Sequence, residues 1–91
     1  MDFIEKVELI KTILKNNGYQ DIANDIAEGQ MSGGTLGEIF MIVCSKLLWI
    51  KQKNKVVYKV IELDAEMLLD YAAGIGYHII AKNNSKYENG I

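Results

Sequence analysis

The stretch Ser-Gly-Gly-Thr-Leu-Gly-Glu, residues 32–38, marks the end of one predicted helix and the start of another. Thr35 and Glu38 have the Thr-x-x-Glu spacing of a capping box. In that motif the threonine hydroxyl accepts from the backbone N–H of the glutamate, and the carboxylate reaches back to the N–H of the threonine. We expect Gly33 and Gly34 to supply permissive backbone dihedrals in the turn. The stretch therefore predicts a tight connection between two helices.

Residues 36–53 form the predicted central helix of the fold. The run 39–44 is apolar throughout, and a helix that is apolar on nearly every side belongs at the centre of a bundle. The longer stretch 39–50 is interrupted by Ser45 and Lys46, and it is far shorter than the roughly 20 residues that a membrane-spanning helix needs. This segment therefore predicts the core of a soluble protein.

Two helices are predicted before the turn. Apolar residues recur every three or four positions from Phe3 to Leu14, which predicts a helix over 2–17 that ends with a C-capping glycine at Gly18. The same period continues over 19–29 and predicts a second, shorter helix that packs back against the first.

The chain after the central helix is harder to interpret. Residues 56–61 contain several β-branched side chains, but no second strand is available to pair with them, so a short helix is favoured over a strand. Asp64 is expected to cap a last helix that ends near Lys82. Residues 83–91 are polar and are expected to fray.

Small residues interrupt the predicted last helix at Gly74 and Gly76. Each glycine costs on the order of 1 kcal/mol relative to alanine in an exposed helix interior, so a compensating contact is expected. With Ala72 and Ala73 they make a shallow face. Packing of the central helix on that face is favoured over a dimer contact.

These elements predict an all-α fold, a single compact bundle of four to five helices around the central helix 36–53, within one domain over 1–82. The chain has 91 residues. A domain of that size buries only about 60–65% of its unfolded surface, which leaves little room for a separate catalytic domain or a deep substrate cavity. A binding or structural module is therefore favoured.

Charge is distributed unevenly along the chain. Residues 1–45 carry seven acids and three lysines, whereas residues 46–91 carry five acids and seven lysines. Because no arginine is present, the bidentate contacts used in sequence-specific DNA reading are disfavoured. The N-terminus shows no secretory signal and Cys44 is the only cysteine, so we predict a cytoplasmic protein.

Catalytic chemistry finds little support in the residues. His78 is the only histidine and is placed late in a helix, and Cys44 has apolar neighbours that raise a thiol pKa. The glycines of 32–35 do not make a phosphate-binding loop, because no lysine follows before Lys46. We expect no enzymatic activity, no cofactor and no metal site.

Five lysines lie close together around Trp49, which fits either a nucleic-acid contact or the solvated end of a buried helix. They are Lys46, Lys51, Lys53, Lys55 and Lys59. The overall acidity and the lack of arginine favour the solvated end. Trp49 itself is interpreted as a lid over the core in preference to a binding hot spot.

The acidic residues form two groups. Asp21, Asn24, Asp25 and Glu28 recur at helical spacing and predict an acidic stripe on the second helix. A second group lies around the start of the last helix and consists of Glu62, Asp64, Glu66 and Asp70. A solvated face explains both groups, and so does a surface matched to a strongly basic partner.

The pattern Gly18-Tyr19, Ile22-Ala23 and Gly-Gly-Thr-Leu-Gly-Glu-Ile at 33–39, followed by an apolar helix with a lysine-rich end, resembles a known family. It is similar to small all-helical immunity proteins of bacterial contact-dependent growth-inhibition systems. Within that family, the pattern is most similar to the proteins that neutralise EndoU-type RNase toxins. The resemblance covers residues 10–50.

The resemblance implies a mechanism of occlusion, in which an acidic helical bundle covers the positively charged RNA-binding cleft of a toxin domain and replaces phosphates with carboxylates. The predicted partner-binding residues lie on two edges. They are Asp21, Asp25 and Glu28 on the second helix, and Asp64, Glu66, Asp70 and Tyr71 on the last. Alanine at the three acids of the second helix is predicted to weaken binding without unfolding the bundle.

Two alternatives stay open at this point. In the first, the chain is a helical homodimer or scaffold subunit whose 72–76 face or Trp49 end is self-complementary. In the second, it is a nucleic-acid-binding regulator that uses the glycine turn as a helix-turn-helix elbow. The second is disfavoured, because the helix after the turn is too apolar to lie in a major groove.

Overall fold

The computed structural model describes residues 2–81 of the chain. Within that range the chain forms four helices: α1 (Phe3–Asn16), α2 (Gln20–Ser32), α3 (Leu36–Lys53) and α4 (Lys55–Gly74). No strand occurs among the described residues, so the all-α prediction is confirmed. The predicted frayed tail, 83–91, lies outside the described residues.

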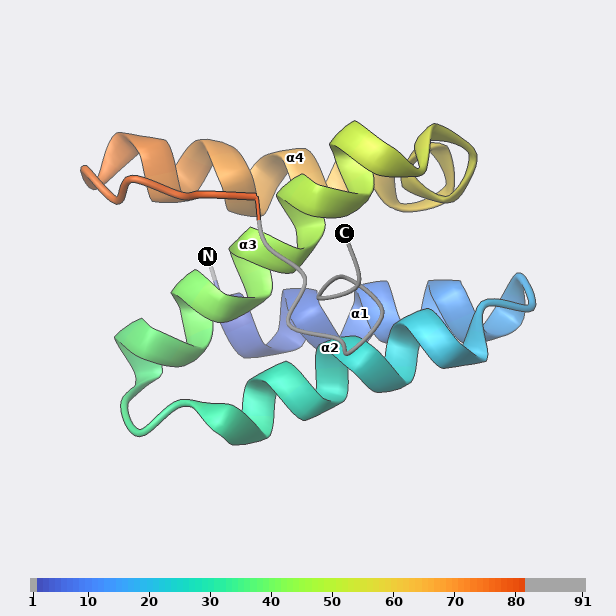
Figure 1. Cartoon of the computed structure of the whole chain (residues 1–91), viewed down its shortest axis with the longest axis horizontal. Helices are drawn as coiled ribbons and strands as arrows, with labels where there is room; N and C mark the ends of the chain where they lie inside the picture. The colour runs from blue at the N-terminus through green and yellow to red at the C-terminus, as the bar shows by residue number, and fades with distance from the viewer. Residues whose placement is uncertain (1, 82–91) are drawn as a thin grey trace, which may run out of the picture.

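The four helices pack in a closed ring (Figure 1). Each helix packs against the next one in the chain, and α1 also packs against α4. As a result, α2 and α4 lie on opposite sides of the bundle. Because the connections are short, the first turns of α1 and α3 lie at the same end of the molecule as the last turns of α2 and α4, on the left in Figure 1.

All four helices contribute to one hydrophobic core. The residues that are buried most completely and have the largest side chains are Val7, Ile10, Leu14, Ile26, Val43, Cys44, Leu47, Ile61 and Leu68. Trp49 packs partly buried against this core, as predicted for a lid. The core therefore holds both acidic helices, α2 and α4, in fixed positions.

The turn at 32–38 forms as predicted in its main feature. The Thr35 hydroxyl accepts from the backbone N–H of Glu38 at 3.1 Å, which caps α3 at the predicted residue. The return bond differs from the prediction, because the carboxylate of Glu38 accepts from the Thr35 hydroxyl and not from its backbone N–H. The backbone of Gly33 and Gly34 also differs from the prediction, since neither residue has the positive φ that only glycine adopts freely.

Helix α1 ends in the predicted way, at a glycine. Gly18 has a φ of +86°, and the backbone N–H of Tyr19 donates to the carbonyl of Leu14 at 2.8 Å. This is a Schellman motif, in which the left-handed residue lets the chain turn back while the last carbonyls keep hydrogen-bond partners.

Helix α4 departs from the prediction at its start. The segment 56–61 and the predicted last helix are one continuous helix that begins at Lys55. Its N-cap is Asn54, whose side chain accepts from the backbone N–H of Val57. The prediction of a cap at Asp64 is wrong, because Asp64 lies in the middle of this helix on its buried face.

Helix α4 also ends earlier than predicted, at Gly74 and not near Lys82. Gly76 has a φ of +88°, and the N–H of Tyr77 donates to the carbonyl of Ala72 at 2.9 Å. This second Schellman motif repeats the Gly-Tyr pair of the first. Gly74 is the last residue of α4 and Gly76 lies beyond it, so the predicted helical position is wrong for Gly76. The predicted packing contact is wrong for both glycines, because a methyl group at either position would meet nothing within 4 Å.

The two glycines are expected to respond oppositely to alanine. Gly74→Ala should raise the free energy of unfolding by about 0.5–1 kcal/mol, because alanine favours a helix and the site is open. Gly76→Ala should lower it by about 1–2 kcal/mol, because a Cβ is strained at positive φ. Urea denaturation of the two variants measures both effects. Shifts in the same direction would contradict the assigned end of α4.

Candidate interaction surface

The acidic stripe of α2 is only partly free for a partner. Asp21 and Glu28 are exposed. Neither of them takes part in any of the ion pairs found among residues 2–81. They lie two helical turns apart, about 10 Å along the axis at 1.5 Å per residue. These two carboxylates are therefore available to an external cation.

Asp25 has a different role from its neighbours on the stripe. Its carboxylate accepts from the Lys46 ammonium at 3.1 Å, and the Lys46 side chain is only 6% exposed, against 30% for Asp25. The Lys46 side chain crosses α2 at Gly29. A Cβ added to Gly29 would lie 2.7 Å from the Cε of Lys46. The lysine was predicted to lie at a solvated helix end, but it is buried between α2 and α3. Asp25 thus neutralises a buried charge.

Asp64 is also taken up by the fold. It is buried on the inner face of α4 and accepts from the Lys6 ammonium of α1 at 3.1 Å. This pair links α1 to α4, as the pair of Asp25 and Lys46 links α2 to α3. A buried carboxylate that already holds an ammonium cannot serve as an open contact for a partner.

Glu66 is bound by two side chains of its own end of the bundle. Lys51 lies 2.7 Å from its Oε2, and the Tyr58 hydroxyl donates to the same oxygen. Two hydrogen bonds lower the pKa of Glu66, and the one from Lys51 has a larger effect than the one from Tyr58. Burial raises the pKa of Tyr58, and the hydrogen bond to Glu66 raises it further. Glu66 is therefore held as a structural anion.

Asp70 and Tyr71 are exposed near the end of α4. The Tyr71 ring packs edge-on against Phe40, with 5.9 Å between ring centroids. The structure does not bring these two residues together with Asp21 and Glu28, because α2 and α4 lie on opposite sides of the bundle (Figure 1). The two predicted edges therefore form two separate surfaces.

Cys44 and His78 carry side chains of the types used in catalysis. Cys44 is buried, and burial raises its pKa to about 12. His78 is exposed and follows α4, whereas the sequence placed it within a helix.

Among residues 2–81, no three side chains of the kinds that bind metals converge on one point. Within the same residues, none of the helices has both the length and the apolar character needed to cross a membrane.

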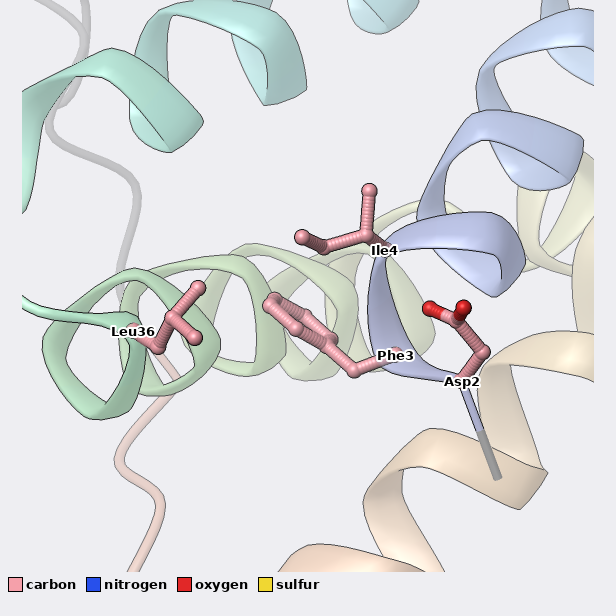
Figure 2. A pocket seen from close by; sticks show the side chains of 4 residues that line it. All are labelled: Asp2, Phe3, Ile4 and Leu36. Atoms are coloured by element: carbon pink, nitrogen blue, oxygen red, sulfur yellow. The ribbon is translucent and has the colours of Figure 1, made fainter.

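One feature that the sequence does not predict is an open hollow of about 440 Å³ between the first turns of α1 and α3 (Figure 2). Asp2, Phe3, Ile4 and Leu36 line it. Leu36 is the residue from which the hollow could have been predicted. It is a large apolar residue directly after the Thr35 cap, and the exposed first turn of a helix ordinarily carries polar residues there.

Searches of protein-family models, of curated proteins and of solved structures with this chain find no match.

Proposed function

We propose that this chain is an immunity-type inhibitor, which binds a basic nuclease toxin domain in the bacterial cytoplasm and blocks its RNA-binding cleft. The observation that carries the proposal is the pair of exposed carboxylates on α2, Asp21 and Glu28, which take part in none of the ion pairs found among the described residues. The resemblance of residues 10–50 to immunity proteins supplies the class of partner.

Occlusion needs no chemistry from the inhibitor. The cations that hold RNA phosphates in a nuclease cleft would pair with the carboxylates of α2, and the body of the bundle would exclude the RNA. Complementary charge speeds association and opposes wrong partners, and the attraction weakens as salt screens it. Asp70 and Tyr71 belong to a second surface on the far side of the bundle, and we propose α2 as the primary contact.

Charge reversal on α2 tests the proposal. The tagged chain captures its partner from the native cells, and the captured domain is identified and assayed for RNase activity with and without the chain. The double variant Asp21→Lys, Glu28→Lys should then bind at least about tenfold more weakly, because like charges across an interface cost several kcal/mol.

Glu62→Lys is the matched control, since Glu62 is also exposed and makes only a long surface pair of 3.9 Å with Lys59. It should change affinity by less than about threefold, as expected for a charge outside the contact. Capture of the chain alone or of nucleic acid would contradict the proposed function. Unchanged affinity in the double variant would remove α2 from the interface.

A further inference from the structure

The hollow between α1 and α3 has an apolar lining that residues 2–81 leave exposed. Ile4 is 49% exposed and Leu36 is 63% exposed, and each lies in the first turn of its helix. Figure 2 shows the Phe3 ring pointing from α1 toward α3, between these two side chains. Apolar side chains that converge on an open hollow can bury an apolar side chain of a partner.

The floor of the hollow is held in place by aromatic packing. The Phe3 ring meets Phe40 edge-on, with 4.8 Å between ring centroids, and Phe40 also contacts Tyr71 and Tyr77. The Tyr77 hydroxyl lies over the start of α3, 3.2 Å from where a Cβ on Gly37 would be. Because these rings are already packed in the free protein, an incoming side chain meets a shaped surface with little ordering cost.

The charges around the hollow select the kind of partner. Asp2 is the one charged residue among the four that line it, and its carboxylate also accepts from the backbone N–H of Glu5 at 3.1 Å. Lys6 is the one lysine in the first two turns of these helices, and it is bound to Asp64. The one charged side chain of the lining is therefore acidic, which favours a basic segment and opposes an acidic one.

We infer that this hollow is an anchor site for one apolar side chain, carried on a lysine- or arginine-rich segment of the partner. The inference rests on the proposed function for the identity of that partner as a basic toxin domain. The anchor site would be a second contact with the partner, at the end of the bundle where α1 and α3 begin, in addition to the electrostatic contact of α2.

Short synthetic peptides test the anchor site without the toxin. Acetyl-Lys-Lys-Phe-Lys-Lys-amide is titrated into the ¹⁵N-labelled full chain, and chemical shifts are followed by NMR. The shifts should concentrate at Phe3, Ile4 and Leu36. A peptide with alanine in place of phenylalanine should bind about tenfold more weakly, because the buried apolar area is lost. A peptide with glutamates in place of lysines should not bind.

Leu36→Ser should abolish the shifts, and Leu63→Ser is its matched control, because Leu63 is also an exposed leucine, 76% accessible, and lies on α4 away from the hollow lining. Thermal melts of both variants verify that they fold. Equal binding of the phenylalanine and alanine peptides, shifts scattered over the bundle, or full binding by Leu36→Ser would each overturn the anchor site. Shifts at the same residues that depend on protein concentration alone would also overturn it, in favour of self-association.

The same variant separates this inference from the proposed function. If the wild-type chain captures and inhibits the toxin domain and Leu36→Ser does so with equal affinity, the anchor site is wrong and the proposed function stands. If the peptide binds at the hollow but the wild-type chain captures no basic nuclease, the proposed function is wrong and the hollow remains a site for basic apolar segments.

Discussion

Replacing Asp25 with alanine is expected to lower the free energy of unfolding by about 2–4 kcal/mol, because the substitution leaves the buried ammonium of Lys46 without its acceptor. The Lys46 side chain is 6% exposed and crosses Gly29 on its way to Asp25, so it has little access to water. Breaking one side of such a pair strands a charge in a poorly solvated place. Urea denaturation, followed by circular dichroism, measures the loss.

Two further variants separate this explanation from a general sensitivity of α2. Asp21→Ala removes an exposed carboxylate from the same helix and should change stability by no more than about 0.5 kcal/mol. Adding Lys46→Met to Asp25→Ala should restore most of the loss, since a buried ion pair can often be replaced by apolar side chains at little cost. An Asp25→Ala variant as stable as the wild type would return Asp25 to the candidate surface.

The structural role of Asp25 decides how binding experiments on α2 must be designed. Alanine at Asp21, Asp25 and Glu28 together was predicted to weaken binding without unfolding the bundle. The ion pair of Asp25 with Lys46 argues against the second half of that prediction, because the triple variant is expected to lose stability as well as affinity. Only Asp21 and Glu28 report on the surface alone.

Local signals in the sequence predict the helix boundaries where a specific motif marks them. The Thr35 cap fixes the start of α3, and Gly18 fixes the end of α1. The same Gly-Tyr pair recurs at Gly76, where α4 ends, but Ile75 and Ile79 continue the helical spacing of apolar residues past it and extend the predicted helix. Asp64 is a common capping residue type, so the sequence predicts a helix start there in place of the observed start at Lys55.

Long-range pairing of charges could not be predicted from periodicity. Lys6 and Asp64 lie 58 positions apart in the chain, and Asp25 and Lys46 lie 21 apart. Helical spacing does put Asp64 on the same face as Ile61 and Leu68, which indicates burial but does not identify the partner lysine. The sequence therefore shows which residue types are present on each helix, whereas the packing decides which of them stay accessible.

Gly33→Ala is expected to lower the free energy of unfolding by about 2–3 kcal/mol through steric overlap. Gly33 has a φ of −87°, which any residue adopts, so backbone freedom does not explain the glycine. A Cβ at this position would lie 2.8 Å from the backbone nitrogen of Ile39 and 2.7 Å from its Cγ1. A backbone atom cannot rotate away as a side chain can, so the turn between α2 and α3 would have to open.

Gly34→Ala is the matched control, since a Cβ there meets only the carboxylate of Glu38 at 3.6 Å, an ordinary contact. It should alter stability by no more than about 0.5 kcal/mol. Opening the turn should also weaken the bond from the Ile39 N–H to the Thr35 carbonyl, now 3.0 Å long, which closes the first turn of α3. Hydrogen exchange at the Ile39 amide should therefore accelerate in Gly33→Ala and not in Gly34→Ala. Equal exchange in both variants would show that the turn absorbs a methyl group without moving α3, and that Gly33 is not needed for the close approach of the two helices.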